Sequence, residues 1–235
     1  MQKRVWIIVL ASILAVCVGL FIVLSLGLGE ACSNYVWPVK GTEGLEYVLN
    51  EDKETYSVKG VGTAEATDIV IATHYEGKLV TKIADSAFKE KNITSVVIPK
   101  SVVVVGANAF YGCNSLTQVE LGEGVKQIGD YAFYKCSGIA QVKITKSVES
   151  IGSSAFAYCT SLTDVEIGEN VKQIKYYAFN ECKNIQTLMF KNPVNWYYRT
   201  SSSSSTAILK SDLENSETAK QKLLVEKYFC EWYRI

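Results

Sequence analysis

The dipeptide Ala-Phe recurs five times at nearly constant spacing along this chain, and this repetition limits the fold more than any other feature. The copies are Ala87-Phe88, Ala109-Phe110, Ala132-Phe133, Ala155-Phe156 and Ala178-Phe179, at intervals of 22, 23, 23 and 23 residues. A fixed period of roughly 20 to 50 residues is typical of proteins in which each repeat is one supersecondary unit stacked on its neighbour. The sequence therefore predicts a repeat solenoid with a 23-residue period.

Each repeat also carries two short extended segments. The first alternates apolar and polar positions and reads Leu116–Leu121, Ile139–Ile144 and Leu162–Ile167, with Ile93–Ile98 before these copies and Ile185–Phe190 after them. The second has the form Val-x-x-Ile and begins at Val125, Val148 and Val171. One coil cannot bury its own apolar side, whereas coils stacked about 4.8 Å apart form a continuous core. We expect a mainly β solenoid with one short helical turn at each Ala-Phe.

Cysteine follows four of the five phenylalanines at a distance of three residues. These cysteines are Cys113, Cys136, Cys159 and Cys182, and Lys89–Asn92 replaces the cysteine-bearing loop in the first repeat. A metal ladder or disulfides between coils would use such a column. Zinc, however, needs four thiolates that converge tetrahedrally, and a disulfide needs two Cβ atoms that point toward each other. A column of parallel side chains satisfies neither requirement, so we interpret these residues as small buried core residues. We predict no metal site.

The combined pattern (Ile/Leu)-Thr-x-Val-x-Ile, then Val-x-x-Ile-Gly-x-x-Ala-Phe-x-x-Cys, resembles the BspA-like leucine-rich-repeat family over residues 66–190. The segments Gly44–Leu49, Tyr56–Gly60 and Asp68–Ile71 resemble the N-terminal hairpin and first strand of such proteins. The resemblance implies a bacterial or protist surface protein that binds other molecules, often in adhesion. It transfers no catalytic residues and no cofactor to this chain.

The N-terminus predicts where the protein resides. A basic head containing Lys3 and Arg4 precedes Val5–Leu28, which has no charged residue. As a helix, this segment would reach about 36 Å, enough for a hydrocarbon core of about 30 Å. The positive-inside rule keeps the basic head cytoplasmic and places residues 29–235 outside. A signal cleaved near Gly29-Glu30-Ala31, which leaves a secreted protein, and a lipoprotein signal with lipidation at Cys32 are the alternatives.

Four regions follow from these patterns. They are a signal-anchor or transmembrane segment at 1–28, a linker and N-terminal β cap at 29–65, the solenoid at 66–190, and a C-terminal cap at 191–235. The cap contains a run of serines at 201–205. Ser216 can cap a helix that continues to about Tyr233, and we expect this helix to cover the last coil.

The charge balance excludes one class of function and weakens another. The chain has 24 Lys+Arg, 24 Asp+Glu and no basic block, which argues against a protein that binds nucleic acid. A single histidine, His74, leaves little material for histidine-based catalysis, and we interpret it as a surface residue. We therefore predict no enzyme activity.

Two columns of side chains should point outward from the first strand of each coil. One holds Ser95, Gln118, Gln141, Asp164 and Thr187, and the other holds Val97, Glu120, Lys143, Glu166 and Met189. From these columns we select six candidate ligand-binding residues: Gln118, Glu120, Gln141, Lys143, Asp164 and Glu166. The expected ligand is a protein or a host surface molecule, and a glycan is the alternative.

Two further hypotheses compete with binding at the strand face. Glu120 and Glu166, two coils apart, would be separated by about 10 Å, near the upper end for an inverting glycosidase. Lys143 between them favours a solvated charge ladder over an acid–base pair. The other hypothesis is a carbohydrate platform formed by Trp196, Tyr197 and Tyr198, although aromatic side chains in a terminal cap more often cover the core.

Overall fold

The computed structural model describes residues 38–199, 205–226 and 230–235, which belong to one compact unit. The predicted anchor at 5–28 and Cys32 lie outside the described residues. Within the described part of the chain, no helix is long and apolar enough to cross a membrane.

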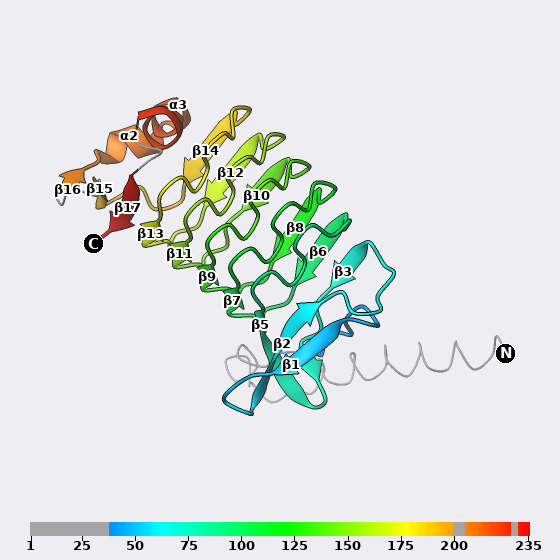
Figure 1. The fold of residues 1–235 in the computed structure, drawn as a ribbon. Helices are drawn as coiled ribbons and strands as arrows, with labels where there is room; N and C mark the ends of the chain where they lie inside the picture. Colours follow the sequence, from blue (N-terminus) through cyan, green and yellow to red (C-terminus); the bar gives the residue numbers. More distant parts are fainter. Residues whose placement is uncertain (1–37, 200–204, 227–229) are drawn as a thin grey trace, which may run out of the picture. The chain divides into compact units, whose positions relative to one another are not determined.

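The first strand of each coil forms one face of the solenoid (Figure 1). Two three-stranded parallel sheets make up this strand face. One contains β3 (Asp68–Val70), β6 (Ser95–Ile98) and β8 (Gln118–Leu121); the other contains β10 (Gln141–Lys143), β12 (Asp164–Ile167) and β14 (Thr187–Phe190). Pairing is in register within each sheet, so that Val96 lies beside Val119 and Val142 beside Val165. The 23-residue period therefore places equivalent side chains in columns, as predicted.

The second extended segment of each coil contributes to one long sheet. Its parallel part contains β2 (Thr55–Gly60), β5 (Lys78–Ile83), β7 (Val104–Val105), β9 (Gln127–Ile128), β11 (Ser150–Ile151) and β13 (Gln173–Ile174). Antiparallel strands extend this sheet at both ends. At the N-terminal end, β1 (Glu46–Leu49) pairs with β2, which confirms the predicted hairpin, and β4 (His74–Tyr75) pairs with β5. At the C-terminal end, β17 (Glu231–Arg234) pairs with β13 and is followed by β15 (Trp196–Arg199) and β16 (Ser205–Ala207).

The Ala-Phe turns of successive coils lie in a column of their own, the turn column, in addition to the strand face and the long sheet. Their phenylalanines stack through the core. Ring centroids of Phe88, Phe110, Phe133, Phe156 and Phe179 are successively 5.2, 5.0, 5.1 and 5.3 Å apart. The stacked rings are nearly parallel, with interplanar angles of 4–7°. Each turn is linked to the next coil by main-chain hydrogen bonds, such as Phe110 N–H to the Ala132 carbonyl at 2.7 Å. The interior of the solenoid is thus held together by aromatic stacking and by a hydrogen-bonded column.

The cysteine column lies beside this stack. Cys113, Cys136, Cys159 and Cys182 are free thiols that are at most 2 % exposed, which confirms their interpretation as small buried residues. Each thiol also donates a hydrogen bond to the carbonyl of the phenylalanine one coil earlier, at 3.0–3.2 Å. Burial raises the pKa of Cys113 to about 11. Cysteine therefore serves as a small core residue that also satisfies a main-chain acceptor.

The C-terminal cap differs from the predicted long helix. It contains α2 (Lys210–Glu214), α3 (Ser216–Lys220) and a single stretch of π-helix, η1 (Gln221–Glu226), and β17 follows. The prediction of one helix from Ser216 to about Tyr233 is wrong for two reasons. Asn215, not Ser216, caps α3, because its side chain accepts hydrogen bonds from the Glu217 and Thr218 N–H groups. The last residues pair with β13, whose open edge would otherwise remain without a partner.

Candidate functional site

The structure brings together the six candidate residues on the strand face in the two predicted columns. Within the second sheet, Gln141 is directly opposite Asp164, and Lys143 is opposite Glu166. Gln118 and Glu120 occupy the same two columns on β8, opposite Ser95 and Val97 of β6. All six point away from the core, whose buried valines alternate with them along the strands.

Two neighbouring grooves run over this face. The first has a volume of about 410 Å³ and is lined by side chains of β6, β8 and β10, including Gln118, Glu120, Gln141 and Lys143. The second has a volume of about 300 Å³ and is lined by β10, β12 and β14, including Asp164 and Glu166. Both grooves are open to solvent and are lined by the outward side chains of neighbouring strands.

The charges on this face are only partly paired. The Glu166 carboxylate lies 3.8 Å from the Lys143 ammonium and 3.1 Å from that of Lys191. Glu120 has no ion pair with any described residue, so the predicted Glu-Lys-Glu ladder forms on one side of Lys143 only. This arrangement leaves one exposed carboxylate free in the first groove.

Asp164 is held in place by two hydroxyl groups. Thr163 donates a hydrogen bond to its carboxylate at 2.7 Å. Hydrogen bonds from Thr163 and Thr187 keep the pKa of Asp164 below its usual value. Asp68 is bound in the same way by Thr94 and Ser95, both at 2.7 Å, and its pKa is also lowered. These carboxylates stay charged at neutral pH and supply fixed acceptors on the first strand of the face, β3, and on β12.

A break between β8 and β10 is the feature that the sequence interpretation missed. No main-chain ladder joins β8 and β10. The same two coils are nevertheless hydrogen-bonded to each other in the long sheet, through β9 and β11, and at the Ala-Phe turns. The main-chain bond that precedes each strand is made by Thr94 to Thr67 (2.8 Å), Thr117 to Thr94 (2.9 Å), Thr163 to Ala140 (2.7 Å) and Gln186 to Thr163 (2.7 Å). Among the described residues, the equivalent bond from Ala140 N–H to the Thr117 carbonyl is absent.

The sequence contains a local signal for this break. Threonine side chains reinforce the normal contact, since Thr117 Oγ1 donates to the Thr94 carbonyl at 3.2 Å and Thr163 Oγ1 to the Ala140 carbonyl at 3.1 Å. Ala140 has no hydroxyl and cannot do the same. Val119 in the opened strand is only half-buried, whereas Val142 and the other residues of its column are at most 3 % exposed.

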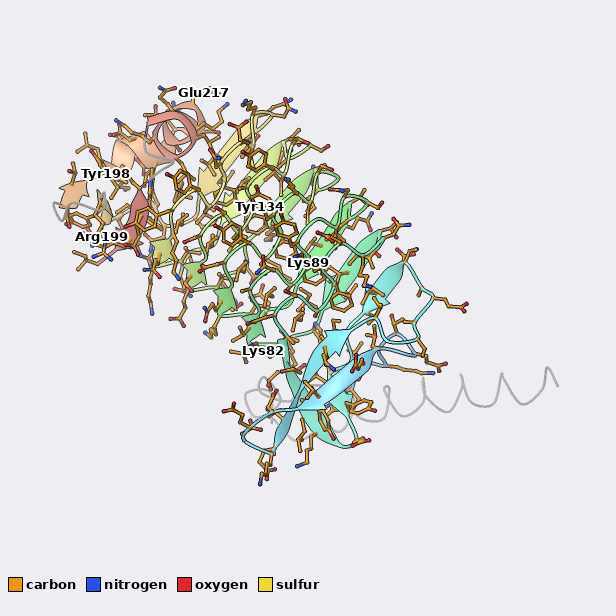
Figure 2. The ribbon with its side chains drawn as sticks, in the orientation of Figure 1. Lys82, Lys89, Tyr134, Tyr198, Arg199 and Glu217 are labelled. Carbon is orange, nitrogen blue, oxygen red and sulfur yellow. The ribbon has the colours of Figure 1, made fainter. Side chains whose placement is uncertain are left out.

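The predicted aromatic platform is not present. Trp196 is 1 % exposed, and its indole N–H donates to the Asn192 carbonyl at 2.9 Å. It packs edge-on against Phe190 at the end of the core. Tyr197 is partly buried and stacks on Tyr233, and Tyr198 is also partly buried on β15 beside Arg199 (Figure 2). The hypothesis of a carbohydrate platform that includes Trp196 is therefore wrong, because this ring covers the last coil.

His74 lies on β4 next to the turn at Glu76-Gly77, away from the strand face. Its ring Nδ1 is 3.1 Å from Thr73 Oγ1, and the side chain is partly buried. Across the described residues, no cluster of three or more potential metal ligands is found.

Comparison with known proteins places this geometry in a family. Six copies of the BspA type leucine rich repeat region match residues 81–208, more than half of the chain. The chain belongs to the BspA-type leucine-rich-repeat family. Its recurring strand, Val-x-x-Ile and Ala-Phe segments are thus the repeat units of this family, as the sequence resemblance predicted.

Several solved leucine-rich-repeat structures are similar to this member of the family. A T. pallidum leucine-rich-repeat protein is 30% identical, with a TM-score of 0.59, over 62% of this chain and 68% of the other. A Bacteroides capillosus protein is 31% identical (TM-score 0.47; 55% and 96% covered). A leucine-rich cell surface protein of Faecalibacterium prausnitzii is 24% identical (TM-score 0.44; 75% and 62% covered). No curated protein matches the chain.

Proposed function

We propose that this chain is a non-catalytic, surface-exposed binding protein that recognises a protein on a host or neighbouring cell through its strand face. One observation carries the proposal: the six candidate residues converge on two adjoining grooves that are open to solvent. The shallow, polar surface of a stacked solenoid suits an extended protein contact.

The arrangement of carboxylates supports binding rather than glycoside hydrolysis. Glu166 is engaged by two lysines, and Lys143 stands between it and Glu120 along the column. An acid–base pair would need one carboxyl group in an apolar environment that keeps it protonated. A partly exposed, lysine-paired carboxylate such as Glu166 is instead typical of a recognition surface.

The proposed location of the binding face rests on the N-terminal sequence. The uncharged segment at 5–28, preceded by Lys3 and Arg4, would anchor the protein and display residues 29–235 outside the cytoplasmic membrane. Secretion after cleavage remains the alternative. Mass spectrometry of the mature N-terminus separates the two, because only the anchored form retains Met1 or Gln2.

Binding is tested with the labelled full chain in detergent micelles against a panel of purified extracellular proteins. The strand-face variant carries Gln118→Ala, Lys143→Ala and Asp164→Ala. A matched control removes the same kinds of side chain from the long sheet, at and directly before β9 and β11: Gln127→Ala, Lys126→Ala and Glu149→Ala. We expect the strand-face variant to lose at least about ten-fold in affinity for any protein that binds, equivalent to 1.4 kcal/mol. Equal affinities for both variants would exclude the strand face as the binding site.

A further inference from the structure

We infer that the break between β8 and β10 is a docking site for an extended peptide segment that carries a basic side chain. The inference rests on the proposed function, because it names the part of the strand face that is used and the class of ligand. Figure 1 shows β8 and β10 as successive strands of the strand face.

The main chain at the break is free to form hydrogen bonds. Ala140 N–H and the Thr117 carbonyl have no hydrogen-bond partner among the described residues, and Ala140 is exposed. Elsewhere in this column, the equivalent groups bond to each other at 2.7–2.9 Å. Both residues line the groove over the break, and an extended peptide lying in it offers N–H and C=O groups as partners for these two main-chain groups.

The groove at the break supplies both an apolar contact and a charge. Val119, which is half-buried here, lies among the residues that line it and provides an apolar floor. Glu120 also lines this groove and has no cationic partner among the described residues. Lys143, which could have neutralised it, lies 3.8 Å from Glu166 instead. A lysine or arginine of the peptide therefore has an available carboxylate, and an acidic residue at the same position is repelled.

Hydrogen exchange on the full chain tests whether the break exists in solution. We expect the Ala140 amide to exchange at least about ten-fold faster than the Thr163 amide, the equivalent of one net hydrogen bond. In an Ala140→Thr variant, the added hydroxyl can bond to the previous coil's carbonyl as Thr117 and Thr163 do, and this second bond should draw the two strands together and slow exchange at position 140. An Ala140 amide that is already as protected as Thr163 would overturn the inference.

Peptide binding tests the ligand class. The probe is a capped octapeptide of alternating threonine and valine with one central lysine. Two matched probes replace the lysine by glutamate or methylate alternate main-chain nitrogens. We expect the lysine probe to bind about five-fold tighter than the glutamate probe, in line with about 1 kcal/mol for a partly exposed ion pair. Methylation should abolish binding, since it removes the main-chain donors.

Two threonine substitutions separate the break from the rest of the face. Ala140→Thr should weaken binding of the lysine probe at least about ten-fold, whereas Gln186→Thr should leave it unchanged. Gln186 occupies the same column, but its N–H already bonds to the Thr163 carbonyl at 2.7 Å. Glu120→Gln should remove the preference for lysine over glutamate.

The outcomes distinguish this inference from the proposed function. The inference would be overturned if Ala140→Thr left the affinity for the lysine probe unchanged or if no peptide probe bound. It would also be overturned if the full chain bound glycans on an array but none of the peptide probes. If the strand-face variant still loses its protein ligand in that case, the proposed function stands and only the docking site is wrong. If neither protein nor peptide binding responds to changes on the strand face, both fall.

Discussion

Replacing Phe133 by leucine should destabilise the protein more than the same substitution at Phe88. Both rings are completely buried. Phe133 stacks on two neighbours, with ring centroids 5.0 Å from Phe110 and 5.1 Å from Phe156, whereas Phe88 stacks on one ring of the described residues, Phe110, at 5.2 Å. Leucine fills much of the same space, so the lost stacking decides the difference between the two variants.

The magnitude follows from the number of stacked contacts. Each aromatic pair contributes about 0.5–1.5 kcal/mol beyond the burial of area. Phe133→Leu removes two such contacts, or about 1–3 kcal/mol, and Phe88→Leu removes one, or about 0.5–1.5 kcal/mol. Both variants share a packing term below about 1.5 kcal/mol, which cancels in the comparison. The free energy of unfolding should therefore fall by about 1 kcal/mol more for Phe133→Leu.

The assay is urea unfolding of the full chain in detergent micelles, followed by circular dichroism and by tryptophan fluorescence. Circular dichroism reports on the coils, and fluorescence, to which all four tryptophans contribute, includes the signal of the buried Trp196 and Trp232 at the C-terminal end. Coincident transitions with an unchanged slope allow midpoints to be converted into free energies. Equal losses for the two variants, or a larger loss for Phe88→Leu, would refute the idea that stacking between neighbouring coils stabilises the solenoid.

Three further substitutions or conditions test the packing. Because burial raises the pKa of Cys113 to about 11, its stabilising effect is present below about pH 9 and is lost as pH rises toward 11. The urea midpoint should fall over that range, and less so in Cys113→Ala. Gly124→Ala should cost about 3 kcal/mol or more in thermal unfolding, since the added Cβ would lie 1.8 Å from the Lys100 carbonyl oxygen. Glu231→Ala should lower the free energy of unfolding, followed by fluorescence, by about 1.5–3 kcal/mol, because the buried carboxylate accepts a hydrogen bond from Arg199 at 2.6 Å; an unchanged free energy would contradict this role.

The repeated part of the fold could be predicted because each coil imposes the same physical demand. Phe133 must be apolar, and so must its equivalents one period away, since all of them lie in one stack. The register of the outward columns follows from this stack, which is why the pairing of Lys143 with Glu166 was predictable. The second partner of Glu166, Lys191, was not predictable, because it follows the last strand at a position where the three preceding coils carry glycine or threonine.

The break at Ala140 shows the opposite case. A repeat pattern emphasises what successive coils share, and alanine at this position looks like a minor departure from threonine. At two of the four intact positions a threonine hydroxyl also reaches the previous coil's carbonyl, as Thr163 does at 3.1 Å, and Ala140 lacks this second bond. Such a contact has no signature in hydrophobic periodicity. Departures from a repeat therefore carry more information about the site than the repeat itself.

The three columns of main-chain hydrogen bonds also explain why one helix could not cap the solenoid. The long sheet ends at β13, and only another strand, β17, can bond to its edge. The strand face ends at β14, where the Leu188 N–H donates to the Ser216 hydroxyl at the start of α3. In the turn column, each phenylalanine N–H donates to the next coil, but Phe179 N–H has no acceptor among the described residues. There α3 and η1 leave a cavity of about 500 Å³ beside the last turn. Three edges with different bonding requirements need a strand, a side-chain acceptor and a cover, so the chain leaves its helix before β17.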